Sequence, residues 1–148
     1  MKRVMIFGTF DGIHDGHRHL VKEARAFGEE VVAVVARDEH VLELKGQTPD
    51  VPLAERLELV QCETDATLAV VDDEILGSYQ VIVEQKPQLL MFGYDQDALM
   101  EDVQAWLEDH GVHLECVQAS AFMPEIYRTS VIREQQRETD EELELASL

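Results

Sequence analysis

The stretch that decides the fold is KRVMIFGTFDGIHDGH, which spans residues 2–17. Its opening part, residues 2–7, is a short apolar run that ends at Gly8, as is typical of a buried parallel strand. A loop rich in glycine and histidine follows over residues 8–16. Apolar residues then recur at helical spacing as far as Gly28, a common helix stop. The stretch predicts a strand, a loop that can approach a ligand closely, and a helix.

Segments typical of strands and helices alternate along the rest of the chain. Further strands are predicted at residues 30–36, 68–71, 88–92 and 113–117, and helices at 53–62, 79–85, 97–110 and from Thr129 or Ser130 past Arg133. Residues 37–52 predict a loop with one helical turn at 41–44. This alternation predicts an α/β fold with a single Rossmann-like, doubly wound parallel sheet of about five strands and helices on both faces. We expect one domain over residues 1–133 and an acidic C-terminal extension over 134–148.

Length and charge exclude several classes of protein. The chain has 148 residues with 12 Lys and Arg against 31 Asp and Glu, a formal charge of −19. Such a chain would be repelled by a polyanion, so nucleic-acid binding is not expected. No apolar run approaches the roughly 20 residues that cross a bilayer, and we expect a soluble, cytoplasmic protein without a membrane partner. Cys62 and Cys116 stand alone in the sequence and predict reduced thiols.

The loop at residues 8–16 has the strongest chemical signal. Ligands of parallel sheets bind beyond the carboxyl ends of the strands, where this loop and loops 37–52, 93–97 and 118–130 are expected. Glycines let the backbone approach a ligand, and a helix N-terminus attracts anions. His14 and His17 can both point at one anionic group there, which favours phosphoryl chemistry. A zinc site without further ligands, or a histidine that only caps the helix, stays open as an alternative.

The sequence GTFDGIHDGH resembles the GTFDxxHxGH motif of the cytidylyltransferase-like nucleotidyltransferases. The resemblance continues with Arg37-Asp38, Lys45-Gly46, the Pro52 to Glu55-Arg56 segment, Gly93-Tyr94-Asp95-Gln96, and Arg128 to Arg133, and so runs from residue 4 to about residue 133. Among the members, the archaeal-type FAD synthases look most similar. Glycerol-3-phosphate cytidylyltransferases share the outer motifs but usually have a different loop at the position of residues 93–96.

The resemblance implies roles on the nucleotide side of the site. His14 and His17 would act as catalytic groups on the α-phosphate. The other nucleotide-binding residues would be Gly8, Thr9, Phe10, Gly93, Asp95, Arg128, Thr129, Ser130 and Arg133. Thr129 and Ser130 are equally well explained as helix caps. Arg128 departs from the Ser or Thr that the family usually has there.

The resemblance also implies roles on the acceptor side. Lys45 would hold the attacking phosphate as a catalytic group, with Asp11, Arg37 and Arg56 nearby. Plainer alternatives exist: a turn cap for Asp11, a solvated lysine, and structural ion pairs for the two arginines. Arg37, Lys45, Arg56, Arg128 and Arg133 would together bring five of the 12 cations to one cleft. His19, His40, His110 and His113 lie in no motif and are expected to be surface or satisfied histidines.

The implied reaction joins ATP and FMN to give FAD and pyrophosphate, with Mg²⁺ or another divalent cation accompanying the triphosphate. Phe10, Tyr94, Phe122, Met123 and Tyr127 are the apolar side chains expected to furnish a flavin pocket. The rival activity is transfer from CTP to glycerol 3-phosphate or another small phosphate. A non-catalytic nucleotide-binding protein is a third alternative. Members of the family are often dimers, so a homodimer is also implied.

Overall fold

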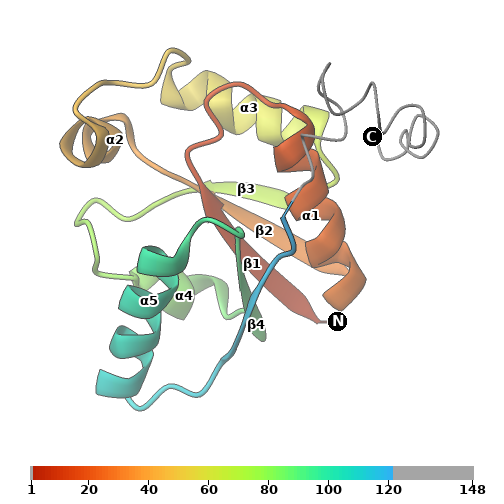
Figure 1. Ribbon diagram of the computed structural model, residues 1–148, viewed down its shortest axis with the longest axis vertical. Helices are drawn as coiled ribbons and strands as arrows, with labels where there is room; N and C mark the ends of the chain where they lie inside the picture. The colour runs from red at the N-terminus through yellow and green to blue at the C-terminus, as the bar shows by residue number, and fades with distance from the viewer. Residues whose placement is uncertain (1, 122–148) are drawn as a thin grey trace, which may run out of the picture.

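The computed structural model describes residues 2–121, which form a five-stranded parallel sheet with helices on both faces (Figure 1). The order across the sheet is β3-β2-β1-β4-β5. In chain order the elements are β1 (Arg3–Gly8), α1 (Asp15–Phe27), β2 (Glu30–Val35), α2 (Asp38–Lys45), α3 (Leu53–Glu63), β3 (Leu68–Val71), α4 (Gln80–Gln85), β4 (Leu89–Phe92), α5 (Asp97–Asp109) and β5 (Glu115–Gln118). The predicted α/β fold is confirmed. The predicted helix at Thr129 or Ser130 and the acidic extension lie outside the described residues.

The central strand β1 is buried on both of its faces. Val4 and Ile6 pack into a cluster with side chains of α1 and α3, and Met5 and Phe7 pack into a second cluster with side chains of α4 and α5. Successive side chains of a strand point to opposite faces, so a strand covered on both sides needs an unbroken apolar run. This explains the uniformly apolar sequence of residues 4–7. Among residues 2–121, no helix is long and apolar enough to cross a bilayer.

The path of the chain creates a switch point beside β1. The chain adds β2 and β3 on one side of β1, then crosses over to place β4 and β5 on the other side. The loops that leave β1 and β4 therefore diverge at the carboxyl edge of the sheet, which is where ligands bind in open α/β sheets.

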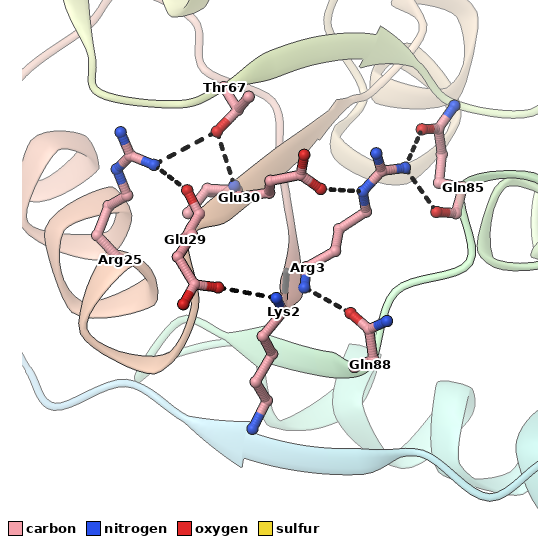
Figure 2. A network of polar contacts seen from close by, with 9 residues as sticks. Lys2, Arg3, Arg25, Glu29, Glu30, Thr67, Gln85 and Gln88 are labelled. Carbon is pink, nitrogen blue, oxygen red and sulfur yellow. Dashed lines mark hydrogen bonds and ion pairs between the residues drawn. The ribbon is translucent and has the colours of Figure 1, made fainter.

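The opposite, amino-terminal edge of the sheet is closed by polar contacts (Figure 2). Arg3 Nε donates to Glu30 Oε1 at 3.0 Å and Arg3 Nη1 donates to the carbonyl of Gln85 at 2.8 Å. Thr67 Oγ1 accepts a hydrogen bond from the backbone N–H of Val31 at 3.0 Å. These contacts tie the starts of the strands to neighbouring loops and leave the carboxyl edge as the open end.

Helix α2 is longer than the single turn predicted at residues 41–44. Asp38 and Glu39 occupy its first turn and Lys45 its last, an arrangement that the helix dipole favours. Gly46 ends the helix in a left-handed conformation, with φ +80°, which glycine adopts without strain. The helix projects Lys45 from the carboxyl end of β2 toward the loop after β1.

Candidate active site

A cavity of about 1020 Å³ lies at the carboxyl edge of the sheet. Segments that follow every one of the five strands contribute to its lining, including Thr9 after β1, Lys45 after β2, Asp72 after β3, Tyr94 after β4 and Ser120 after β5. The location agrees with the expected position of the site. The loop after β3, which the sequence analysis did not single out, is also part of it.

The loop after β1 is held by a buried aromatic ring. Phe10 has a positive φ of +52° and is packed in the core cluster of α1 and α3. A Cβ atom at Gly8 would lie only 2.8 Å from Phe10 Cε2, so glycine is required there. The Phe10 ring, which was expected to contribute to a flavin pocket, is only 1% exposed and anchors the loop, and it also belongs to the lining of the cavity.

His14 and His17 form a reciprocal cap at the start of α1. The Nδ1 atom of His14 accepts from the backbone N–H of Gly16 at 3.1 Å, and the backbone N–H of His14 donates to Nδ1 of His17 at 3.2 Å. An Nδ1 atom that accepts a hydrogen bond has no proton, so in each neutral ring Nε2 has the hydrogen. The rings are stacked with centroids 3.8 Å apart, and both line the cavity. Helix capping and a role in the cavity are therefore compatible.

Burial controls the charge of His17. Its removal from solvent, and then the nearby His14 and Arg18, lower the pKa of His17 to about 4. A backbone hydrogen bond with Gly12 acts in the opposite direction. Near pH 7 His17 is therefore neutral and can offer an Nε2–H hydrogen bond without a full positive charge.

Gly16 sits where a side chain would displace this pair. A Cβ atom at position 16 would lie 2.9 Å from Cε1 of His14. Among the described residues, no group of three or more His, Cys, Asp or Glu side chains is arranged to hold a metal ion.

Lys45 brings a positive charge to the same cavity. Its Nζ donates to Oγ1 of Thr9 at 3.5 Å, which joins the end of α2 to the loop after β1. Both residues line the cavity. The structure thus brings the predicted catalytic lysine and the predicted catalytic histidines to one site.

Asp11 is used to connect two loops. Its Oδ2 accepts from the backbone N–H of Asp50 at 2.9 Å and its Oδ1 accepts from that of Val51 at 2.8 Å. The hydrogen bond from Asp50 is the main cause that lowers the pKa of Asp11. Burial acts in the opposite direction, and the hydrogen bond from Val51 and the charges of Arg56 and Lys45 lower the pKa further. Both carboxylate oxygens of Asp11 thus accept hydrogen bonds from backbone N–H groups. This arrangement agrees better with the alternative of a turn cap than with the predicted contact to the acceptor.

Arg56 is fully buried and is a framework residue. Its Nη1 donates to the carbonyls of Thr9 at 2.7 Å and Ala36 at 2.8 Å, and its Nη2 pairs with Asp38. The guanidinium therefore has no exposed surface for the acceptor contact that the resemblance implied. The structure instead contains the alternative, a structural ion pair between Arg56 and Asp38.

Arg37 also lies outside the lining of the cavity. Its Nε donates to the carbonyl of Asp72 at 2.9 Å, and its Nη1 lies 3.9 Å from Oε2 of Glu39. Of the cations expected to share one cleft, Arg128 and Arg133 fall outside the described residues. Of the three such cations within residues 2–121, which are Arg37, Lys45 and Arg56, only Lys45 lines the cavity.

The loop after β4 is positioned by two glutamines. Gln96 Oε1 accepts from the backbone N–H of Gly93 at 2.7 Å, and Gln96 Nε2 donates to the carbonyl of Phe7 at 3.0 Å, which joins the ends of β4 and β1. Gln118 Nε2 donates to the carbonyls of Gly93 and Tyr94 at 3.1 and 3.0 Å. Asp95 and Gly93, which were expected to contact the nucleoside, both line the cavity. The role of Gln118 was missed, although its place at the end of β5 was a usable signal.

Comparison with known proteins identifies the family. The model of the family described as cytidylyltransferase-like matches residues 5–135. The chain belongs to the cytidylyltransferase-like family. It is 34% identical over 131 residues to the FAD synthase of Pyrococcus horikoshii, covering 85% of this chain and 82% of that protein. It is 35% identical over 137 residues to the FAD synthase of Thermoplasma acidophilum, covering 90% of this chain and 92% of that protein.

Solved structures place this cytidylyltransferase-like chain among similar folds. The lipopolysaccharide core biosynthesis protein of Thermoplasma volcanium has a TM-score of 0.74 and 32% identity, covering 82% of this chain and 98% of that one. Pantothenate synthetase of Thermus thermophilus has a TM-score of 0.57 at 18% identity, over 80% of this chain and 55% of that one, and shows the shared fold alone.

His40 is a second residue that the motifs of this cytidylyltransferase-like chain did not reveal. It was expected on the surface or satisfied, but it is only 5% exposed and lines the cavity. Its Nε2 donates to the carbonyl of Glu74 at 3.0 Å, and its Nδ1 has no hydrogen-bond partner among the described residues. The side chain lies close to Asp72, whose pKa is raised chiefly by burial. The lining of the cavity thus includes two polar side chains, His40 and Asp72, that sequence patterns did not indicate.

Proposed function

We propose that the protein is an FAD synthase that transfers the adenylyl group of ATP to FMN and releases pyrophosphate. The observation that carries the proposal is the meeting of His14, His17 and Lys45 in one cavity at the switch point of the sheet. The two relatives at 34% and 35% identity are FAD synthases, which supports ATP and FMN as the substrates.

The reaction is an in-line displacement at the α-phosphorus of ATP. An oxygen of the FMN phosphate forms the new P–O bond, and the bond from the α-phosphorus to the bridging oxygen breaks, so pyrophosphate leaves with the electron pair. Hydrogen bonds from Nε2 of His14 and His17 stabilise the charge that builds up on the α-phosphate oxygens. Lys45 holds the FMN phosphate as a point charge, and no proton has to be removed from the attacking oxygen.

The nucleoside would lie toward the loop after β4, on the opposite side of β1 from Lys45. Gly93 and Asp95 line the cavity there. Gly8 and Thr9 present backbone groups to the phosphates and sugar. Arg128, Thr129, Ser130 and Arg133 remain predicted contacts of the β- and γ-phosphates.

A divalent cation accompanies the triphosphate, and we assign Mg²⁺ to this role. The carboxylates at the cavity, such as Asp15 and Asp95, are dispersed, and within residues 2–121 no cluster of three metal-binding side chains forms. This donor set fits an ion that takes most of its ligands from phosphate oxygens and water. When bound, Mg²⁺ supplies neutralisation of the phosphate charge.

The products of one incubation distinguish the candidate activities. Purified protein is supplied with Mg²⁺, all four nucleoside triphosphates and both FMN and glycerol 3-phosphate, and the products are identified by mass. The proposal predicts FAD and pyrophosphate. A CDP-alcohol as the product would establish the cytidylyltransferase alternative, and the absence of any pyrophosphate would leave a non-catalytic nucleotide-binding protein.

A further inference from the structure

The side of the cavity toward α2 and β3 exposes apolar side chains to solvent. Leu44, at the end of α2, is 68% exposed, and Leu76, in the loop after β3, is 40% exposed. Both line the cavity, and the better-buried Val41 and Tyr79 lie in the same lining. Apolar groups that stay exposed at a cavity mark a surface that a ligand covers.

This apolar surface and the proposed nucleoside site lie on opposite sides of β1. β2 and β3 lie on one side of β1, and β4 lies on the other. Leu44 directly precedes Lys45, the residue assigned to the acceptor phosphate, whereas Gly93 and Asp95 follow β4. The exposed leucines therefore belong to the acceptor end of the cavity.

The lining of the cavity near β3 and α2 also contains polar groups. Asp72 has a half-buried carboxyl group, and the nearby His40 has a buried Nδ1 without a partner among the described residues. A flavin ring matches this division, because one end of the ring is a dimethylbenzene and the imide at the other end has one N–H donor, which the Asp72 carboxylate can accept. Glycerol phosphate has no apolar part that would cover the leucines.

We propose that the isoalloxazine ring of the acceptor packs against Leu44 and Leu76, with its imide N–H directed at the carboxylate of Asp72. The inference rests on the proposed function, since it takes FMN as the acceptor. Leu44 and Leu76 are then specificity residues for a flavin, and the phosphate of the same ligand reaches Lys45.

The chain offers matched controls for a binding test. Leu42, on the same helix as Leu44, is 48% exposed, and Ile75, next to Leu76, is 72% exposed, yet neither lines the cavity. Leu44→Asp and Leu76→Asp are compared with Leu42→Asp and Ile75→Asp by titration of FMN and riboflavin, with quenching of flavin fluorescence as the readout. ATP binding is measured on the same variants by calorimetry.

We expect Leu44→Asp and Leu76→Asp to weaken FMN and riboflavin binding by about tenfold or more, since each removes apolar cover from the ring. The flavin affinities of the two control variants stay within about twofold of those of the unmodified protein, and the ATP affinity is unchanged in all four variants. Lys45→Ala weakens the binding of FMN but leaves the binding of riboflavin unchanged, because riboflavin has no phosphate. Riboflavin methylated at N3 binds the unmodified protein about tenfold less tightly, because the imide donor is lost.

The outcomes separate this inference from the proposed function. FAD synthesis together with unchanged flavin binding in Leu44→Asp and Leu76→Asp overturns the ring site and leaves the function standing. If the same two variants lose ATP affinity and keep flavin affinity, the surface belongs to the nucleoside site, and the inference of a ring site is also overturned. Equal binding of riboflavin and its N3-methyl derivative removes the imide contact. Absence of both flavin binding and FAD synthesis in the unmodified protein defeats the proposed function itself, and the inference with it.

Discussion

His17 acts by a hydrogen bond whose strength increases as the reaction proceeds. It is neutral near pH 7, and its Nε2–H meets charge that develops on the α-phosphate only in the transition state. His17→Ala is expected to lower kcat by roughly a hundredfold while changing ATP affinity little. Pyrophosphate release and calorimetric ATP binding measure the two effects. His113→Ala, at an exposed position outside the cavity, is the control, and turnover that survives in His17→Ala would contradict the mechanism.

The same half-buried ring makes folding stability depend on pH. Since the pKa of His17 falls from an ordinary 6.5 to about 4 in the folded chain, the unfolded chain binds more protons between these values. Stability contributed by the neutral ring is complete above pH 6.5 and is lost as the pH falls toward 4. After allowance for solvent screening, we expect the protein to lose about 1–2 kcal/mol more than His17→Gln over this window. Urea unfolding at pH 7 and pH 4.5 tests this, and parallel losses in both proteins would refute it.

At the scale of elements, Arg56 holds the ends of β1 and β2 and the start of α2 in register. Its buried guanidinium donates to the carbonyls of Thr9 and Ala36 and pairs with Asp38. Arg56→Met leaves these acceptors buried without a donor, and the free energy of unfolding is expected to fall by about 3 kcal/mol or more. Arg18→Ala removes exposed ion pairs and is expected to cost less than about 1 kcal/mol. Urea titration compares the two variants, and equal losses would show that Arg56 is not a framework residue.

The elements differ in how far the sequence predicts them. The strands follow from local apolar runs such as residues 4–7, because burial on both faces requires them. Helix α2 was predicted as a single turn because part of its support is distant: Asp38 pairs with Arg56, 18 residues away along the chain. Asp11 and Arg56 were placed at the acceptor by resemblance, but their contacts with residues 50, 51, 9 and 36 depend on how loops meet in space. The loop after β3 was not singled out, because its residues belong to none of the quoted motifs.

At the scale of the whole molecule, the charge of −19 opposes the binding of a free triphosphate. Within the described residues, Lys45 is the one predicted cation that lines the cavity, so residues 2–121 offset little of the phosphate charge. We expect that EDTA abolishes FAD formation and weakens ATP binding by about tenfold or more, and that Mg²⁺ restores both. Binding of riboflavin, which has no phosphate, is expected to be unchanged by EDTA. Calorimetry measures the binding of ATP and fluorescence quenching measures the binding of riboflavin. Full ATP affinity in EDTA would contradict this dependence on the cation.

The direction of transfer is the central claim, and one isotope measurement tests it. FMN labelled with ¹⁸O in the peripheral oxygens of its phosphate is incubated with ATP, Mg²⁺ and the purified protein, and the products are analysed by mass. If an FMN oxygen attacks the α-phosphorus of ATP, FAD retains all the label and pyrophosphate has none. FAD that has lost label, label in the pyrophosphate, or FMN recovered unchanged would contradict the account.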